Sequence, residues 1–115
     1  MKYLVPLNPR DMKGEFTPFS PEKVIRGDMA QLLDEREGAG KSVISIGTWA
    51  SSEGAISCQY DEDELCVIAA GRVRLTNQEG ESAEFGPGDG FLILNGFRGV
   101  WDSLEPLRKW YVIYK

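Results

Sequence analysis

The sequence contains no histidine. Imidazole is the side chain that most often acts as a general base near neutral pH, and it is the commonest protein ligand for metal ions. Its absence excludes Ser-His and Cys-His nucleophile pairs, histidine general bases and imidazole metal sites. Any catalytic or binding chemistry must therefore come from carboxylates, amines, hydroxyls, thiols or amides.

Cysteine is also scarce, since Cys58 and Cys66 are the only two. Two thiols are too few for a disulfide framework, and their spacing is not the CxxC of zinc or redox sites. We therefore expect both to be buried as small hydrophobic side chains.

Long apolar runs and basic stripes are missing as well. No run approaches the roughly 18 apolar residues of a membrane-spanning helix, and Pro6 and Pro9 interrupt the start of the chain, where a signal peptide would lie. The formal net charge is −5. Nucleic acids and anionic membranes bind basic surfaces, so we expect neither as a partner. The expected location is the cytoplasm.

What is present indicates one all-β domain spanning residues 1–115, a length suited to a single core. Four of the six prolines lie in the first 21 residues, and proline cannot donate to a strand ladder. Residues 1–27 are thus predicted to form an extended arm covering an edge or an end of a sheet. Residues 42–115 are predicted to form the barrel core, from short apolar or alternating runs such as SVISIGTW, LCVIAAG and KWYVIYK.

The stretch DMAQLLDERE at residues 28–37 has two interpretations. Asp28 as N-cap, Gln31 in a capping box and Gly38 as a stop would favour a helix. The same residues could form one strand of a hairpin that turns at residues 38–41 and returns through SVISIGTW. The local pattern leaves both open.

Residues 64–103 carry a recognisable pattern. Glu64 precedes Gly71 with six residues between them, and the sequence continues GRVRLT; PGD then begins at Pro87, and WDSLEPLRKWY begins at Trp101. These blocks resemble the cupin superfamily, and within it the small single-domain cupins related to (S)-ureidoglycine aminohydrolase. The resemblance implies a double-stranded β-helix, or jelly-roll, barrel that forms a homodimer. It also favours the hairpin interpretation of residues 28–37.

The same resemblance implies a bound divalent metal and release of ammonia from a ureido carbon, but the ligand positions have changed. Cys58, Tyr60 and Gly99 stand where the family has its three histidines, so only Glu64 remains of the four ligands. One carboxylate beside a thiol is a poor site for a metal that needs three or four converging donors. We therefore expect no metal and no other cofactor.

Side chains alternate along a strand, which predicts those that face the barrel interior. Cys66 and Ile68 are predicted to face it, and the last strand contributes either Lys109 with Tyr111 or Trp110 with Val112. The predicted ligand-binding residues are Trp49, Cys58, Tyr60, Glu64, Trp101, Lys109 and Tyr111. A small barrel can also be filled entirely by its own side chains, which is the competing structural interpretation.

Glu64 carries the functional hypothesis, because an ionised carboxylate in an apolar interior must be paired or protonated. If Lys109 faces inward, the two side chains could form a pair that binds a small polar metabolite. We expect a small-molecule binding or sensing module. The alternative is a metal-independent enzyme acting on a small nitrogen-containing metabolite, with Glu64 as general base and Tyr60 as hydrogen-bond donor. A structural subunit with a filled barrel is the third interpretation.

Overall fold

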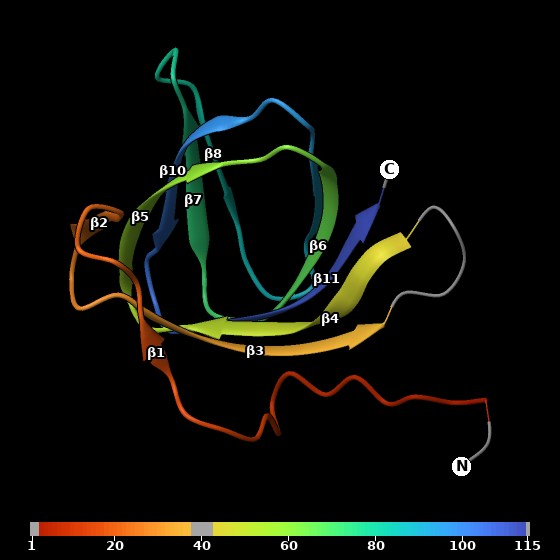
Figure 1. Cartoon of the computed structure of the whole chain (residues 1–115). Coiled ribbons are helices and arrows are strands. Elements are labelled where there is room, and N and C mark those ends of the chain that lie inside the picture. Colours follow the sequence, from red (N-terminus) through yellow and green to blue (C-terminus); the bar gives the residue numbers. More distant parts are fainter. Residues whose placement is uncertain (1–2, 38–42, 115) are drawn as a thin grey trace.

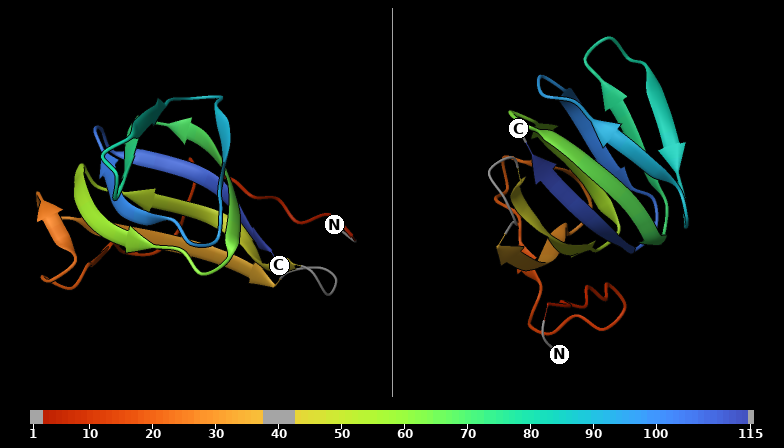
Figure 2. Two further views of the ribbon diagram at one scale, coloured as in Figure 1. Left: turned by 90° about the horizontal axis from the view of Figure 1, so that it is seen from above. Right: turned by 90° about the vertical axis from the view of Figure 1, so that its right-hand side faces the viewer.

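The computed structural model describes residues 3–37 and 43–114, which form strands and connecting turns. The described segments contain eleven strands and no helix, so the predicted all-β fold is confirmed. None of these segments forms a helix long and apolar enough to cross a membrane. Figures 1 and 2 show the strands curving around a common interior in a jelly-roll arrangement of two sheets.

Both sheets are antiparallel. The first sheet has six strands, in the spatial order β1 (Thr17–Pro18), β3 (Ala30–Glu37), β4 (Val43–Ser51), β11 (Leu107–Tyr114), β6 (Asp63–Ala70) and β9 (Gly90–Ile93). The second has five, in the order β2 (Val24–Arg26), β5 (Gly54–Gln59), β10 (Arg98–Ser103), β7 (Val73–Asn77) and β8 (Ser82–Phe85). Strands β4, β11 and β6 at the centre of the first sheet, with β5 and β10 of the second, position the site described below.

The ambiguous stretch at residues 28–37 forms strand β3, so the helical interpretation is wrong. Strand β3 pairs with β4 from Gln31 to Glu37, with Leu33 opposite Trp49. A strand here completes the ladder of β4 and brings Gln31 and Glu35 to the inner face, whereas a helix would leave that ladder open. The turn expected at residues 38–41 lies outside the described residues.

The N-terminal arm covers two sheet edges, as expected, because β1 pairs with β3 at the edge of the first sheet and β2 pairs with β5 at the edge of the second. The part of the arm before β1 lies across a face of the first sheet. The guanidinium of Arg108 donates to the Pro9 carbonyl at 2.8 Å, and the indole N–H of Trp110 donates to the Leu7 carbonyl at 2.8 Å. These contacts hold the segment across the outside of β11, where Figure 1 shows it passing beneath the sheet. Turns interrupt the extended arm at two places, where the Asp11 N–H donates to the Asn8 carbonyl and the Lys23 N–H donates to the Ser20 carbonyl.

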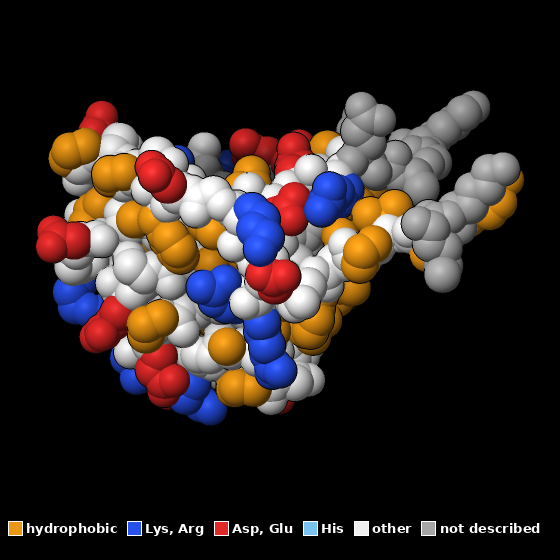
Figure 3. All heavy atoms as spheres, turned by 90° about the horizontal axis from the view of Figure 1, so that it is seen from below, with side chains coloured by type: hydrophobic (Ala, Val, Ile, Leu, Met, Phe, Trp, Pro, Cys, Tyr) orange, Lys and Arg blue, Asp and Glu red, His pale blue; other side chains and the backbone are white. Residues whose placement is uncertain are grey.

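Hydrophobic side chains are exposed near the start of the described segment, with Tyr3 93% and Val5 65% accessible. Figure 3 shows hydrophobic groups scattered among charged ones on this side of the molecule. Exposed apolar groups of this kind are consistent with contact to a second copy, and the homodimer stays a prediction.

Three hydrogen-bonded side chains tie the two sheets together inside the core. The Trp101 indole N–H on β10 donates to Ser103 Oγ at 2.9 Å, and Ser103 Oγ shares a 2.7 Å hydrogen bond with Ser51 Oγ on β4. All three side chains are buried. They lie against a hydrophobic core formed by Met29, Ile56, Cys66, Ile68, Val73, Leu75, Ile93 and Leu107. The network satisfies polar groups that would otherwise be costly to bury.

Replacing Ser103 with alanine should destabilise the protein by about 2 kcal/mol, because it leaves the Trp101 N–H and the Ser51 hydroxyl without a partner. Ser82→Ala, at an exposed position, is the matched control and should change the free energy of unfolding by less than ~0.5 kcal/mol. Urea denaturation followed by tryptophan fluorescence measures both. Equal stability of the two variants would contradict this role for the network.

Candidate functional site

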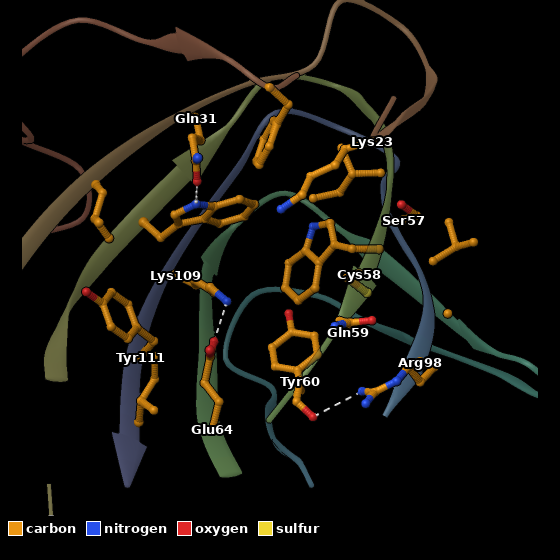
Figure 4. A pocket seen from close by; sticks show the side chains of 18 of the residues that line it. Lys23, Gln31, Ser57, Cys58, Gln59, Tyr60, Glu64, Arg98, Lys109 and Tyr111 are labelled. Carbon is orange, nitrogen blue, oxygen red and sulfur yellow. Dashed lines mark hydrogen bonds and ion pairs between the residues drawn. The ribbon is translucent and has the colours of Figure 1, made fainter. Parts of the chain in front are cut away.

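A cavity of about 840 Å³ opens between the two sheets. Its size falls within the roughly 300–1,000 Å³ of small-molecule sites, and it shows that side chains do not fill the barrel mouth. All seven predicted ligand-binding residues line it: Trp49, Cys58, Tyr60, Glu64, Trp101, Lys109 and Tyr111. Figure 4 shows the labelled members of this set around one space. The structure thus brings the predicted residues together, although their binding role stays a prediction.

The last strand presents Lys109 and Tyr111 to the cavity, which decides between the two faces left open by the sequence. Trp110 points to the other side of the sheet, where it bonds Leu7. Lys109 lies directly opposite Trp49 of β4 in the strand register. This pairing places an amine and an indole on the same inner face.

A buried ion pair forms the floor of the cavity. The Lys109 ammonium donates to Glu64 Oε2 at 2.7 Å, and the two side chains are only 6% and 10% exposed. The Cys66 thiol donates to the same Glu64 oxygen at 3.0 Å, and Lys109 also contacts Cys66 Sγ at 3.4 Å. Glu64 Oε1 accepts no hydrogen bond from any described residue, so one carboxylate oxygen is left to receive a donor from a ligand.

Two indoles complete the surroundings of the ammonium. Lys109 Nζ lies 4.9 Å from the ring centre of Trp49 and 4.4 Å from that of Trp101. The rings meet edge to face, with centroids 5.4 Å apart and an interplanar angle of 84°. Ammonium ions within about 6 Å of an aromatic face are attracted by its quadrupole. The indoles therefore offset part of the cost of burying the charge.

The charge state of Lys109 follows from this environment. Burial by itself lowers the pKa of a lysine, but here the Cys66 and Glu64 side chains beside the ammonium raise the pKa of Lys109 above its ordinary value. Lys109 is therefore a cation at neutral pH. An ammonium has no lone pair, so Lys109 does not act as a nucleophile in this state.

The two thiols and the Tyr60 phenol of the inner cavity are neutral at physiological pH. Burial raises the pKa of the Cys58 thiol to about 11 and that of the Cys66 thiol to about 12. Burial also raises the pKa of Tyr60 well above its ordinary value. Tyr60 thus keeps its hydroxyl proton, and the hydroxyl makes no hydrogen bond to a described residue. It is available as a donor to a ligand.

The cavity also has polar lining that the sequence analysis missed. Lys23, just before β2, and Arg98 on β10 contribute cations, while Glu35 on β3 contributes a carboxylate that accepts a 3.2 Å hydrogen bond from the Tyr111 hydroxyl. Gln31 accepts a 2.7 Å hydrogen bond from the Trp49 indole N–H and fixes that ring. Alternation along β3 would have indicated Gln31 and Glu35 once the segment was recognised as a strand.

The residues at the cavity floor do not fit the metal that the cupin resemblance implies. Cys58 and Tyr60 occupy two ligand positions with a protonated thiol and a protonated phenol, which are weak donors. The ammonium of Lys109 already binds Glu64, the one remaining ligand. Within residues 3–37 and 43–114, no three Cys, Asp or Glu side chains converge as metal ligands do.

The third ligand position is closed by the backbone. A β-carbon added at Gly99 would lie 1.9 Å from the Thr76 carbonyl oxygen on the neighbouring strand β7. No real side chain makes so short a contact, so a histidine at this position would require the backbone to move.

The two sheets, the cavity between them and the inward-facing glutamate define a small jelly-roll barrel of the cupin class. The chain belongs to the EutQ-like cupin domain family, whose model matches residues 38–111. None of the curated proteins compared with it matches. The more specific likeness to ureidoglycine aminohydrolase is not established by these comparisons.

Solved structures support the fold. A Pseudomonas syringae pv. tomato protein of unknown function from the DUF861 family superposes with a TM-score of 0.76 at 25% identity, covering 93% of this chain. The chain spans 46% of the length of that protein. A putative ethanolamine utilization protein Q from Salmonella typhimurium superposes with a TM-score of 0.64 at 18% identity, covering 90% of this chain and 97% of that one. The Clostridium difficile EutQ protein superposes with a TM-score of 0.66 at 15% identity, covering 75% of this chain and 63% of that one.

A double-mutant cycle should reveal the ion pair. Glu64→Gln leaves a buried ammonium and Lys109→Met leaves a buried carboxylate, so each should cost about 3 kcal/mol or more of stability. The double variant carries no buried charge, so it should lose clearly less than the sum of the two single losses. Chemical denaturation at neutral pH measures all three proteins.

The exposed ion pair between Arg74 and Glu84, at 3.5 Å, provides the control. Glu84→Gln should change stability by about 0.5 kcal/mol or less, because solvent screens that pair. Additive losses for Glu64→Gln and Lys109→Met would show that the two groups do not depend on each other.

Proposed function

We propose that the protein is a small-molecule binding or sensing module that works without a metal. The observation that carries this proposal is the Lys109 ammonium bound to Glu64 at the floor of an open cavity. The pair gives the floor a fixed polar structure, and the indole walls supply apolar surface. Apolar walls with a few oriented polar groups are the usual composition of a ligand site.

Two groups are positioned to orient a ligand. Glu64 Oε1 can accept a hydrogen bond, and the Tyr60 hydroxyl can donate one. Neither has a partner among the described residues, while the remaining polar groups of the floor bond one another. The ligand therefore meets one acceptor and one donor in a site whose geometry is already set, which reduces the ordering cost of binding.

The second candidate is a metal-independent enzyme related to ureidoglycine aminohydrolase, acting on a small nitrogen-containing metabolite. The specific observation in its favour is the same free Oε1. Lys109 bonds Glu64 through Oε2, and Oε1 could accept a proton from a bound substrate or water while Tyr60 donates a hydrogen bond to that substrate. Binding is required in both candidates, and turnover distinguishes them.

Thermal-shift screening of the untagged protein against a metabolite library tests the proposal. A ligand at about 100 times its Kd should stabilise the folded protein by ~2.7 kcal/mol. The same stabilisation should appear in the presence of a chelator, because the Lys109 ammonium and not a metal ion binds Glu64 at the floor of the cavity. Glu64→Gln keeps the shape of the floor but replaces an acceptor oxygen, so it should weaken the shift.

Two results would overturn the proposal. One is the absence of any stabilising ligand, which would leave the cavity without a binding role. The other is a ligand shift that disappears with the chelator and returns with manganese, zinc or iron, together with about one metal ion per chain by elemental analysis.

A further inference from the structure

The charges around the cavity define the class of ligand, and this inference rests on the function proposed above. We infer that the ligand is a small monocarboxylate with an apolar body, its carboxylate bound at Lys23 and its body lying against Trp49. The argument uses the charges that line the cavity, the position of Lys23 and the accessible parts of the wall.

Most of the charges that line the cavity have partners of opposite sign or a hydrogen bond. Lys109 and Glu64 neutralise each other at 2.7 Å, and Arg98 lies 3.5 Å from Asp61 and also donates to the Tyr60 carbonyl. Glu35 accepts its hydrogen bond from Tyr111. Among the described residues, Lys23 makes no ion pair and no side-chain hydrogen bond. It is the lining cation that has no anionic partner.

Lys23 is held in place by its backbone and directed into the cavity. Its carbonyl accepts a 2.8 Å hydrogen bond from the Ser57 N–H on β5, which fixes the segment just before β2 against the second sheet. Figure 4 shows the Lys23 side chain extending into the cavity, on the side away from Glu64. An ammonium in this position attracts an anion into a space bordered by low-dielectric walls.

The accessible wall beside Lys23 is apolar. Trp101 is only 1% exposed and Tyr111 only 4%, so these two rings support the wall from behind. Trp49 and Phe19 are partly exposed and line the cavity, and they are the surfaces that a ligand body can contact. Trp49 is held by Gln31 at 2.7 Å. A flat or compact apolar body would lie against these rings while its charged end reaches Lys23.

The other groups of the cavity fit one negative charge. The Cys58 thiol and the Tyr60 phenol are neutral, because burial raises both pKa values, so neither repels an anion. Tyr60 can donate a second hydrogen bond to the ligand. An amine bound at Lys23 would meet like charge, since Glu35, the lining carboxylate that has no cationic partner among the described residues, lies beside Tyr111 on the other side of the cavity. A dianionic phosphate would bring two charges to a single unpaired cation. A monocarboxylate matches this balance better than either.

The test uses four probes that share a phenyl ring: phenylacetate, phenylacetamide, phenethylamine and phenyl phosphate. Binding to the full chain is measured by titration calorimetry and by quenching of tryptophan fluorescence at neutral pH. Phenylacetate should bind about tenfold or more tightly than each of the other three probes. The neutral amide loses the charged hydrogen bond to Lys23, the amine carries the same sign of charge as Lys23, and the phosphate carries one negative charge too many. Added salt should weaken phenylacetate binding.

Lys23→Gln should weaken phenylacetate binding about tenfold without affecting the melting temperature, because the Lys23 side chain makes no hydrogen bond or ion pair with the described residues and the backbone hydrogen bond to Ser57 is kept. Lys13→Gln is the matched control. Lys13 is an exposed lysine that bonds Asp11 at 3.1 Å and does not line the cavity. Its substitution should leave binding unchanged.

The outcomes separate this inference from the proposed function. Binding of the amide, the amine or the phosphate as tight as that of phenylacetate would overturn the carboxylate assignment and leave the binding function standing. The carboxylate assignment would also be overturned if all library ligands were neutral or cationic, or if carboxylate ligands bound the Lys23→Gln variant as tightly as the unchanged protein. The binding function would stand in both cases. If neither the probes nor the library contain a ligand, both the assignment and the binding function fail.

Discussion

The ion pair between Lys109 and Glu64 is the interaction on which the site depends. Two opposite charges are buried on the neighbouring strands β11 and β6 of the first sheet. Desolvating them is costly unless they lie in contact and their remaining hydrogen-bonding groups are satisfied. Contact requires β11 and β6 to hold their register, with Tyr111 opposite Cys66 and Lys109 opposite Ile68. The pair therefore restrains the strand alignment while it forms the polar floor of the cavity.

The same pair gives the barrel a resident cation. Glu64 occupies the position of a metal ligand in the resembled cupins, and here it binds an ammonium that comes from the chain itself. An ammonium supplies positive charge and hydrogen-bond donors but has no vacant coordination position for a substrate oxygen. The arrangement is therefore suited to recognising a ligand, and any chemistry at this site would depend on Glu64 Oε1 and Tyr60.

The sequence predicts the all-β class because its alternating runs and turn residues are local signals. It also indicates which residues of β5, β6 and β10 face inward, since the glycine and PGD spacings resemble those of cupins. Two features could not be obtained from local pattern. Residues 28–37 carry a helical pattern, and only pairing with β4 makes them a strand. Lys23 joins the site only through the folded path of the segment before β2, so no spacing in the sequence could reveal it.

Nuclear magnetic resonance of the lysine side-chain nitrogens tests the central claim most directly, because it reports the charge of each ammonium as a function of pH. The account predicts that Lys109 stays protonated beyond the pH at which exposed lysines titrate, near their ordinary pKa of 10.5, and that its signal shows restricted motion from the contact with Glu64. Loss of the Lys109 proton near neutral pH would contradict a buried ion pair and, with it, the proposal that the site works without a metal.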